Sequence, residues 1–383
     1  MGSNGNETDG TPATFWIPNA ANDLIENVAA GSAQSGFWYE LRVRGKRAAE
    51  MEGQDPRRQN LGRFVGNVAH SNRGPGLKFY LNGYHPNEIQ NITGFRAYRN
   101  WEYGVRLHRV KNLRFVNSKF ADQRKSMFIT RGNEIHVVSS TFSGLSKSYS
   151  DLLERRQRGS TTSCSRLESL ERTGIEMYTT NPGGIREIDR KESGLVLDQV
   201  SFRGFDVPGC NQDMAAFTIG TGTKSYSTLE LMSSFRDVTM DRDAIDLCDG
   251  MEEGVDDFYL SDLDGMTMGT KRRRPGTIMV NTARMMVFAD PQKCSIRNKR
   301  CYATCVDHCF RTINYYLPRQ GTEGFSMKIC KRHNPDVCFS VAGSLFEEIQ
   351  ALPRRFAVHL PAGEYDAAFQ DKNGNAVLPP RVY

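Results

Sequence analysis

The sequence predicts an all-β protein: a right-handed parallel β-helix of about eight rungs, followed by a small disulfide-rich β domain at the C-terminus. The first observation is a repeated run in which a small residue precedes alternating apolar positions. The shortest interval between two runs is 22 residues, and strands of about five residues in units of that length are typical of a β-helix. The runs are Gly36–Glu40, Gly76–Tyr80, Gly104–His108, Ser126–Thr130, Gly174–Tyr178, Ala216–Gly220, Ala244–Cys248 and Gly276–Val280.

The second observation is the alternation within the runs, which predicts an apolar core stacked along one axis. Successive side chains of a strand point to opposite faces, so the second and fourth residues of each run point inward. Each rung adds about 4.8 Å, which gives a solenoid of about 38 Å. A β-sandwich would show hairpin signals about every 8–12 residues, and these are scarce before residue 350. The inward positions are Phe37, Tyr39, Leu77, Phe79, Val105, Leu107, Met127, Ile129, Ile175, Met177, Phe217, Ile219, Ile245 and Leu247.

The third observation is a polar position that lies four residues before each of the first four runs. Ser32, Asn72, Asn100 and Asp122 occupy it. Small polar side chains at equivalent turns of successive rungs can stack and satisfy neighbouring backbone groups. We therefore expect a polar ladder at one corner of the coil.

Composition and charge limit the classes of function. The 383-residue chain is 38% hydrophobic and has a net charge of +6, which is mild for 43.2 kDa, so we expect a folded protein without a nucleic-acid partner. No stretch approaches the roughly 18 apolar residues of a membrane span, so we expect no membrane insertion by this chain. The opening segment MGSNGNETDGTPATF has no secretory signal, so if the protein is secreted, this chain is a fragment or its targeting segment lies elsewhere. We expect the chain to be part of a larger multidomain protein.

The repeat pattern ends near residue 290, which sets the predicted domains. We expect a flexible segment at 1–14, the β-helix at 15–290 and the C-terminal β domain at 291–383. Alternating runs at 355–360 and 365–369 flank a Pro-Ala-Gly turn, which predicts a hairpin in the last domain.

Cysteines cluster in the last quarter of the chain. The spacing Cys301-x3-Cys305-x3-Cys309 would lie on one face of a helix, and His308 is close to it. Zinc sites usually show a tighter cysteine pair, so disulfides are favoured over zinc. The disulfide candidates are Cys294, Cys301, Cys305, Cys309, Cys330 and Cys338, whereas Cys164, Cys210 and Cys248 are left unassigned.

The opening block ATFWIPNAANDLIENVAAGSAQSGFWYEL carries a family signature, together with Asn67–Ser71, Asp262–Gly265 and the run that begins at Gly276. These motifs resemble a family that contains the cell migration-inducing and hyaluronan-binding protein, the transmembrane cell-surface hyaluronidase and fibrocystin-like receptors. The resemblance implies a β-helix in a surface protein. Some members are linked to hyaluronan binding and depolymerisation, and others have no established enzyme activity. The family's residues for hyaluronan degradation lie in an upstream G8 domain, so the resemblance transfers no catalytic residue to this chain.

Alternation also places a second set of side chains on the outer face of the runs. Aromatic faces stack on sugar rings, and Lys and Arg pair with carboxylates, so this face predicts binding of an acidic polysaccharide. The alternative is that these side chains only stabilise exposed strands by cross-strand stacking. The predicted substrate-binding residues are Trp38, Lys78, Tyr80, Arg106, His108, Phe128 and Tyr178.

Glu176 and Asp246 are candidate catalytic residues because they share one outward column. With one strand between them, their backbones would lie about 10 Å apart. Their side chains could then reach the separation of about 6.5–9.5 Å that inverting glycosidases use, one as acid and the other as the base that activates water. Solvated surface charge is the alternative.

A lyase would need other groups on the same face. Arg106 or Lys78 would stabilise an enolate, and His108 or Tyr80 would be the base. Neither set forms a motif, and the sequence contains no P-loop, dinucleotide fingerprint, GxSxG or HExxH.

We expect no cofactor, with calcium as the one possibility that the sequence suggests. Asp262 and Asp264 precede Gly265 like the beginning of a calcium loop, with hard carboxylate oxygens at alternate positions. The rest of an EF-hand is missing, because its twelfth position is Arg273 rather than Glu. A turn without metal is the alternative.

Two Asn-x-Thr sequons begin at Asn6 and Asn91, and they predict N-glycosylation. Together with the clustered cysteines they indicate an oxidising compartment, and we expect an extracellular or cell-surface location. The leading hypothesis is an extracellular module that binds a polysaccharide, most favourably an acidic glycan such as hyaluronan. The alternatives are a polysaccharide hydrolase or lyase, and a structural or adhesion scaffold within a larger surface protein.

Overall fold

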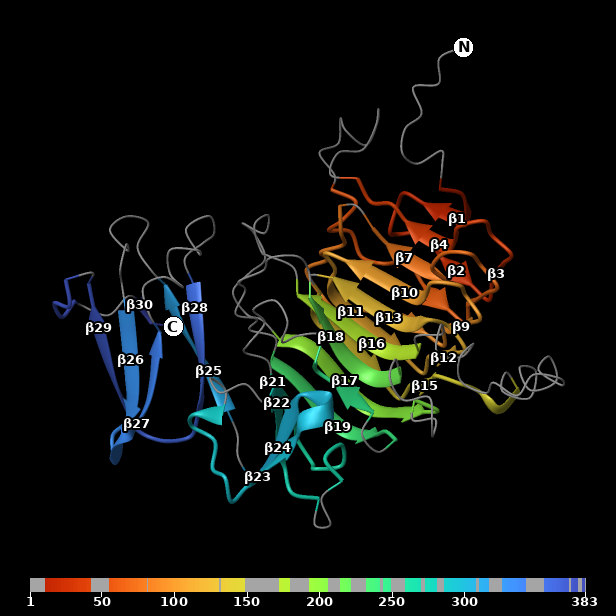
Figure 1. Cartoon of the computed structure of the whole chain (residues 1–383). Helices are drawn as coiled ribbons and strands as arrows, with labels where there is room; N and C mark the ends of the chain where they lie inside the picture. Colours follow the sequence, from red (N-terminus) through yellow and green to blue (C-terminus); the bar gives the residue numbers. More distant parts are fainter. Residues whose placement is uncertain are drawn as a thin grey trace. The chain divides into compact units, whose positions relative to one another are not determined.

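The computed structural model shows a chain built almost entirely of strands (Figure 1). It divides into two compact units: the first is Met1–Tyr178, Ser193–Ile219 and Arg236–Asp246, and the second is Thr179–Glu192, Gly220–Phe235 and Leu247–Tyr383. The structure describes residues 11–42, 55–80, 82–130, 132–148, 172–179, 193–205, 214–221, 232–241, 244–248, 259–269, 273–280, 286–307, 310–316, 326–341, 355–371, 373–377 and 381–382.

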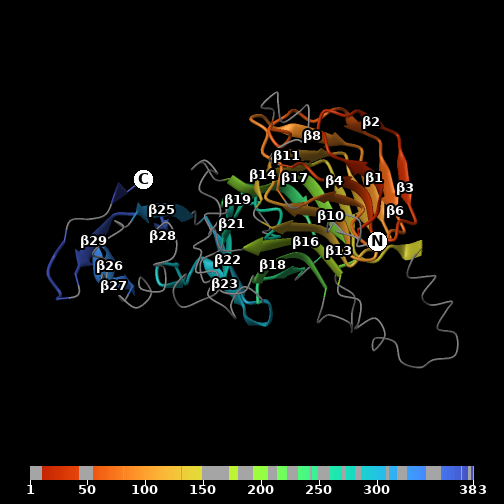
Figure 2. The ribbon, with the colours of Figure 1, turned by 90° about the horizontal axis from the view of Figure 1, so that it is seen from above.

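The first unit is a parallel β-helix whose first face is an eight-stranded parallel sheet (Figure 2). Seven of its strands come from the predicted runs. The first strand, Ala13–Ile17, was not predicted and pairs with the run after it. In sheet order the strands are β1 (Ala13–Ile17), β4 (Ser35–Tyr39), β7 (Leu77–Phe79), β10 (Tyr103–His108), β13 (Lys125–Thr130), β16 (Arg172–Thr179), β18 (Met214–Thr221) and β20 (Ile245–Asp246).

Two further parallel faces complete each coil. The second face contains β2 (Leu24–Ile25), β5 (Phe64–Val65), β8 (Gln90–Thr93), β11 (Lys111–Val116), β14 (Asn133–Val138) and the first half of β17 (Ser193–Arg203). The third face contains β3 (Val28–Ala30), β6 (Val68–His70), β9 (Arg96–Tyr98), β12 (Lys119–Ala121), β15 (Thr141–Ser143) and the end of β17.

The predicted core is confirmed by register and burial. Val105 on β10 pairs with Leu77 on one side and with Met127 on the other, and all three side chains are fully buried. Aromatic rings from successive coils also stack inside the solenoid, such as Phe120 on Phe142 at 4.7 Å. Burial of these rungs is the main stabilising term of the unit.

The polar ladder forms at the corner before the first face. Asn72 Nδ2 donates to Asn100 Oδ1 at 2.9 Å and to the carbonyl of Ala29 at 3.1 Å, while Asn72 Oδ1 accepts the N–H of Ser32 at 2.9 Å. The next rung contributes Gln123 and not the predicted Asp122, because Asn100 Nδ2 donates to Gln123 Oε1. The turn from Gln123 to β13 is one residue shorter than the turn from Asn100 to β10, which shifts the ladder position by one.

The ladder explains the small residue that begins each early run. A Cβ added at Gly76 would lie 2.8 Å from Asn100 Nδ2, and one added at Gly104 would lie 2.2 Å from Gln123 Nε2. No such contact is tolerated in real proteins, so the stacked amides require glycine at these positions.

In the second unit, the described strands after residue 258 pair antiparallel, apart from one parallel pairing. Ser233–Phe235 of β19 (Met232–Thr239) pair parallel with β21 (Tyr259–Asp262). β22 (Gly276–Val280) pairs antiparallel with β21, so the prediction of a parallel rung at this run was wrong. The sequence could not show this, because side chains alternate with a period of two in both parallel and antiparallel strands. β24 (Tyr302–Val306) then pairs antiparallel with β22 and with β23 (Cys294–Arg297).

The last part of the chain forms two three-stranded sheets. One contains β25 (Phe310–Tyr316), β28 (Arg355–Pro361) and β30 (Arg381–Val382), and the other contains β26 (Ser326–Lys331), β27 (Asn334–Val341) and β29 (Tyr365–Gln370). The predicted hairpin of 355–360 with 365–369 was therefore wrong, because β28 pairs with β25 and β29 pairs with β26. A buried cluster packs around this part of the chain: Phe288, Met327, Ile329, Phe339, Leu360 and Phe369.

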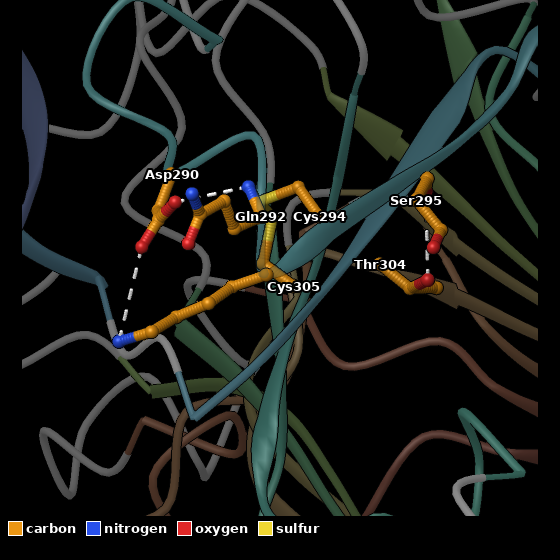
Figure 3. The surroundings of a disulfide bond; sticks show 7 residues. Asp290, Gln292, Cys294, Ser295, Thr304 and Cys305 are labelled. Atoms are coloured by element: carbon orange, nitrogen blue, oxygen red, sulfur yellow. Dashed lines mark hydrogen bonds and ion pairs between the residues drawn. A yellow bond between two sulfur atoms is a disulfide. The ribbon is translucent and has the colours of Figure 1, made fainter.

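Three disulfides form among the described residues of the second unit. Cys294–Cys305 and Cys330–Cys338 join directly paired antiparallel strands, and Cys248 is joined to Cys301 across 53 residues. Figure 3 shows the first of these between β23 and β24. The cysteines do not share the helix face that their spacing would give: a 3₁₀ turn, η2 (Asn298–Arg300), precedes Cys301, and Cys305 lies on strand β24. Cys309, Cys164 and Cys210 lie outside the described residues.

We predict that Asn72→Ala destabilises the first unit strongly. The change leaves the buried carbonyl of Ala29 and the N–H of Ser32 without their side-chain partner, which should cost about 3 kcal/mol of unfolding free energy. Denaturant unfolding followed by circular dichroism measures the effect. Asn22→Ala is the control, because Asn22 is exposed and its loss should cost less than about 0.5 kcal/mol. Equal losses for the two variants would contradict the ladder's role.

Candidate functional site

The predicted outward column is one continuous row across the first sheet. Direct pairing joins Trp38 to Lys78, Lys78 to Arg106, Arg106 to Phe128 and Phe128 to Glu176. At the far end Thr218 pairs with Asp246, on strands that follow β16 in the sheet. We call these residues the outward row.

The neighbouring column follows the same register. His108 pairs with Thr130, and Thr130 pairs with Tyr178. The ring of Tyr80 lies 5.3 Å from the imidazole of His108. Tyr178 is placed by its backbone alone, since its side chain lies outside the described residues.

Much of the outward row is buried rather than open to solvent. Trp38 is 3% exposed, Lys78 8% and Glu176 4%, whereas Tyr80, Arg106 and His108 are partly exposed. The partly exposed side chains are therefore the ones that a polymer can reach first, and the buried ones support them from below.

Cations and aromatic rings alternate along this row. Lys78 Nζ lies 4.4 Å from the ring centroid of Trp38 and 4.9 Å from that of Tyr80. The Arg106 guanidinium carbon lies 4.4 Å from the ring centroid of Tyr80 and 5.7 Å from that of Tyr103. Such contacts hold a cation in place without neutralising its charge.

Neither of these two cations has an ion-pair partner among the described residues. Arg106 Nε and Trp38 Nε1 are also buried without a hydrogen-bond partner. Burial, and then the charge of Arg106, lower the pKa of Lys78 to about 8. The row thus contains positive charge without an ion pair, and donor groups without a hydrogen-bond partner, among the described residues.

His108 is oriented by its neighbour on the next rung. The Thr130 hydroxyl donates to the carbonyl of Leu107 at 3.0 Å, so it accepts from His108 Nδ1 at 2.9 Å. This contact fixes the imidazole ring beside Tyr80 and Arg106.

Glu176 is held by an ion pair. Its carboxylate lies 2.6 Å from Lys125 Nζ, and Lys125 also lies over the ring of Phe128 at 5.6 Å. An ammonium at this distance stabilises the ionised carboxylate, which is the form of a base and not of a proton donor. Asp246 is partly exposed, two strands away in the sheet.

Sequence reasoning missed further contributors to this region. Trp16 on β1 precedes Trp38 in the row and donates from Nε1 to Glu40 at 2.9 Å, and Glu40 also pairs with Arg42. Tyr103 stacks on Phe128 at 5.0 Å. The alternating segment ATFWI contained the signal for β1, because it repeats the pattern of the later runs.

The two aspartates proposed for calcium shape a turn. Asp262 is buried, and its two carboxylate oxygens accept the N–H groups of Gly265 and Met268 at 3.1 and 2.8 Å. Asp264 accepts the N–H of Met266 at 3.1 Å. In the part of the chain that the structure describes, no group of three or more His, Cys, Asp or Glu side chains could hold a metal ion.

Of the two sequons, one lies among the described residues. Asn91 lies exposed on β8, where its amide is accessible for modification. Asn6 lies outside the described residues. Within the described ranges, no helix is both long and apolar enough to cross a membrane.

Comparison with known proteins gives matches to the N-terminal part of the β-helix. Residues 2–77 match the family described as the CEMIP β-helix. Fibrocystin-L of Mus musculus is 33% identical over 85 residues and that of Homo sapiens is 35% identical over 63 residues. These matches cover 22% and 16% of this chain, and the chain spans only 2% of the length of each relative. The resemblance predicted from the motifs is confirmed for this part of the chain.

Two solved structures were also matched, both of them phage tailspike proteins. One, from an Acinetobacter baumannii phage, is 10% identical with a TM-score of 0.16 and covers 92% of this chain and 64% of its own. The other, from an Escherichia coli phage, is 8% identical with a TM-score of 0.17 and covers 97% and 59%. These TM-scores are too low to show a shared fold.

We predict that Asp262 makes the stability of the second unit depend on pH. Burial, together with the neighbouring carboxyl of Asp264, raises the pKa of Asp262 from 3.8 to about 6. The folded protein therefore holds a proton between about pH 4 and 6 that the unfolded chain lacks. The stabilising contribution is full below about pH 4 and is lost as the pH rises through about 6.

The Asp262→Asn variant tests this dependence. Between pH 4 and 7 the wild-type unfolding free energy should fall relative to that of the variant, on the order of 2 kcal/mol. Denaturant unfolding at a series of pH values measures the difference, with Asp290→Asn as a control at a partly exposed turn. A constant difference across this range would contradict the prediction.

Proposed function

We propose that this chain is an extracellular β-helix module that binds an acidic polysaccharide, such as hyaluronan, along the outward row. The observation that supports this most strongly is the pair Lys78 and Arg106, which lie on aromatic rings and form no ion pair with the described residues. A carboxylate of a uronic acid would supply the missing counter-charge. The family match at residues 2–77 points in the same direction.

The geometry suits a linear polymer. Successive residues of the row are about 4.8 Å apart, because each comes from the next strand of the sheet. The partly exposed ring of Tyr80 lies beside Arg106, so a sugar ring on Tyr80 would place its carboxylate within reach of the guanidinium. His108, held by Thr130, adds a polar group one column away.

A hydrolase that uses the same row is the second candidate. It rests on the shared column of Glu176 and Asp246, on strands separated by β18. In that reaction Asp246, which is partly exposed, would be the proton donor, and the ion-paired Glu176 would activate water. A lyase would use Arg106 or Lys78 beside His108 or Tyr80, and the ring of Tyr80 lies close to both cations and to the imidazole of His108.

An extracellular setting is supported by the disulfides. Three bonds occur among the described residues, and such bonds persist in oxidising compartments. The exposed sequon at Asn91 fits the same setting.

We predict that Arg106→Ala weakens binding of size-defined hyaluronan by about 10- to 100-fold, the loss of one charge-assisted contact. Calorimetry or glycan-array retention measures the affinity, and the size of the recovered polymer is read in the same samples. Arg114→Ala is the matched control, because Arg114 is partly exposed at the same rung on the second face. Unchanged affinity in Arg106→Ala would contradict the proposal. Shortening of the polymer by the wild type would show that the chain is an enzyme and not a binding module.

We also predict that this binding weakens as the pH rises from about 7 to about 9. Lys78, whose pKa is lowered to about 8, loses its charge over this range. Lys78→Arg keeps a cation that does not titrate there, so its binding should stay constant between the same pH values. If the wild type and Lys78→Arg respond equally to pH, the charge of Lys78 does not contribute to binding.

A further inference from the structure

The third face of the solenoid contains a second group of cations, separate from the outward row. Its strands β3, β6, β9, β12 and β15 contain no Asp or Glu. Arg96 on β9 pairs directly with Lys119 on β12, and both side chains are exposed. Two strands beyond β12 on this face, Arg203 of β17 pairs with Ser143 of β15 and is also exposed.

Aromatic side chains accompany these cations. The rings of His70 and Tyr98 stack at 4.8 Å with an interplanar angle of 5°, and Tyr98 is 37% exposed. In the turn that follows β9, Trp101 is 79% exposed. The Trp101 N–H donates to the carbonyl of Asn72, which places Trp101 one rung beyond the exposed Arg73.

The two cationic regions differ in a way that selects different ligands. On the outward row, Lys78 is buried and the cations are covered by aromatic rings. On the third face, Arg96, Lys119 and Arg73 are exposed, with no ion pair to any described residue. Arg96 and Lys119 lie on adjacent strands, about 4.8 Å apart at the backbone, which raises the local positive potential.

We propose that this third face, with Arg73, Arg96, Lys119, Trp101 and the Tyr98–His70 stack, binds a sulfated polysaccharide of the heparin type. The paired cations Arg96 and Lys119, on strands that contain no carboxylate, match a polymer with several anionic groups per repeat better than one with a single carboxylate. Guanidinium groups pair bidentately with sulfate oxygens as they do with phosphate. The exposed ring of Trp101 supplies a surface for a sugar ring beside Arg73. This site is independent of the outward row.

The test uses the full chain and immobilised heparin. The wild type should be retained at 0.15 M salt or above, and the double variant Arg96→Glu/Lys119→Glu should lose at least about tenfold in affinity with a smaller salt dependence. Trp101→Ala should weaken binding without changing the salt dependence. The control Lys293→Glu/Lys328→Glu makes the same change in net charge at exposed positions of the second unit and should stay within about twofold of the wild type.

Three results would overturn the proposal. An equal loss in the control pair would show a response to net charge alone. Equal binding of heparin from which the sulfates have been removed would show that sulfate is not recognised. An Arg106→Ala variant that loses heparin binding as strongly as Arg96→Glu/Lys119→Glu would show one shared site. Arg106→Ala is also the test of hyaluronan binding. If the proposed function fails, Arg106→Ala leaves hyaluronan affinity unchanged; if this site fails, Arg96→Glu/Lys119→Glu leaves heparin affinity unchanged.

Discussion

The stacked amides at one corner of the coil are the interaction on which the rest of the first unit depends. Asn72 and Asn100 bond to each other and to carbonyls of the preceding rung, and Gln123 continues the series. They occupy the space beside Gly76 that any other side chain would need. Each coil is thereby held to the next in one register, and a slip of one residue would turn the apolar residues of a strand to the outside.

Fixed register also creates the functional surfaces. Residues from runs that are 28 and 40 positions apart in the sequence become neighbours, so Lys78 lies on the ring of Trp38 and Arg106 lies on the ring of Tyr80. The same stacking brings Arg96 beside Lys119 on another face. A solenoid therefore builds a row of like or complementary groups from short strands, with no long loop to position them.

Strand alternation made the core and the order of the outward row predictable, because it fixes which side chains share a face. It did not reveal that β22 runs antiparallel or that β28 and β29 belong to different sheets, since the period is the same for every pairing partner. Strand alternation also could not predict that Trp38 is buried, because exposure depends on neighbours from other coils. The partner of Cys248 lies 53 residues away, a distance at which spacing carries no information.

That long-range bond has a mechanical consequence. Tension applied to the two ends of the chain passes from Cys248 directly to Cys301, and the covalent bridge carries it around the segment that contains β21, β22 and β23. With the bridge intact, this segment contributes nothing to extension under load. Reduction of this bond alone would release the chain from Cys248 to Cys294, because the Cys294–Cys305 disulfide still bridges the rest; the gain is about 140 Å at about 3.4 Å for each extended residue. The redox state of one bond thus sets how far the protein can be stretched.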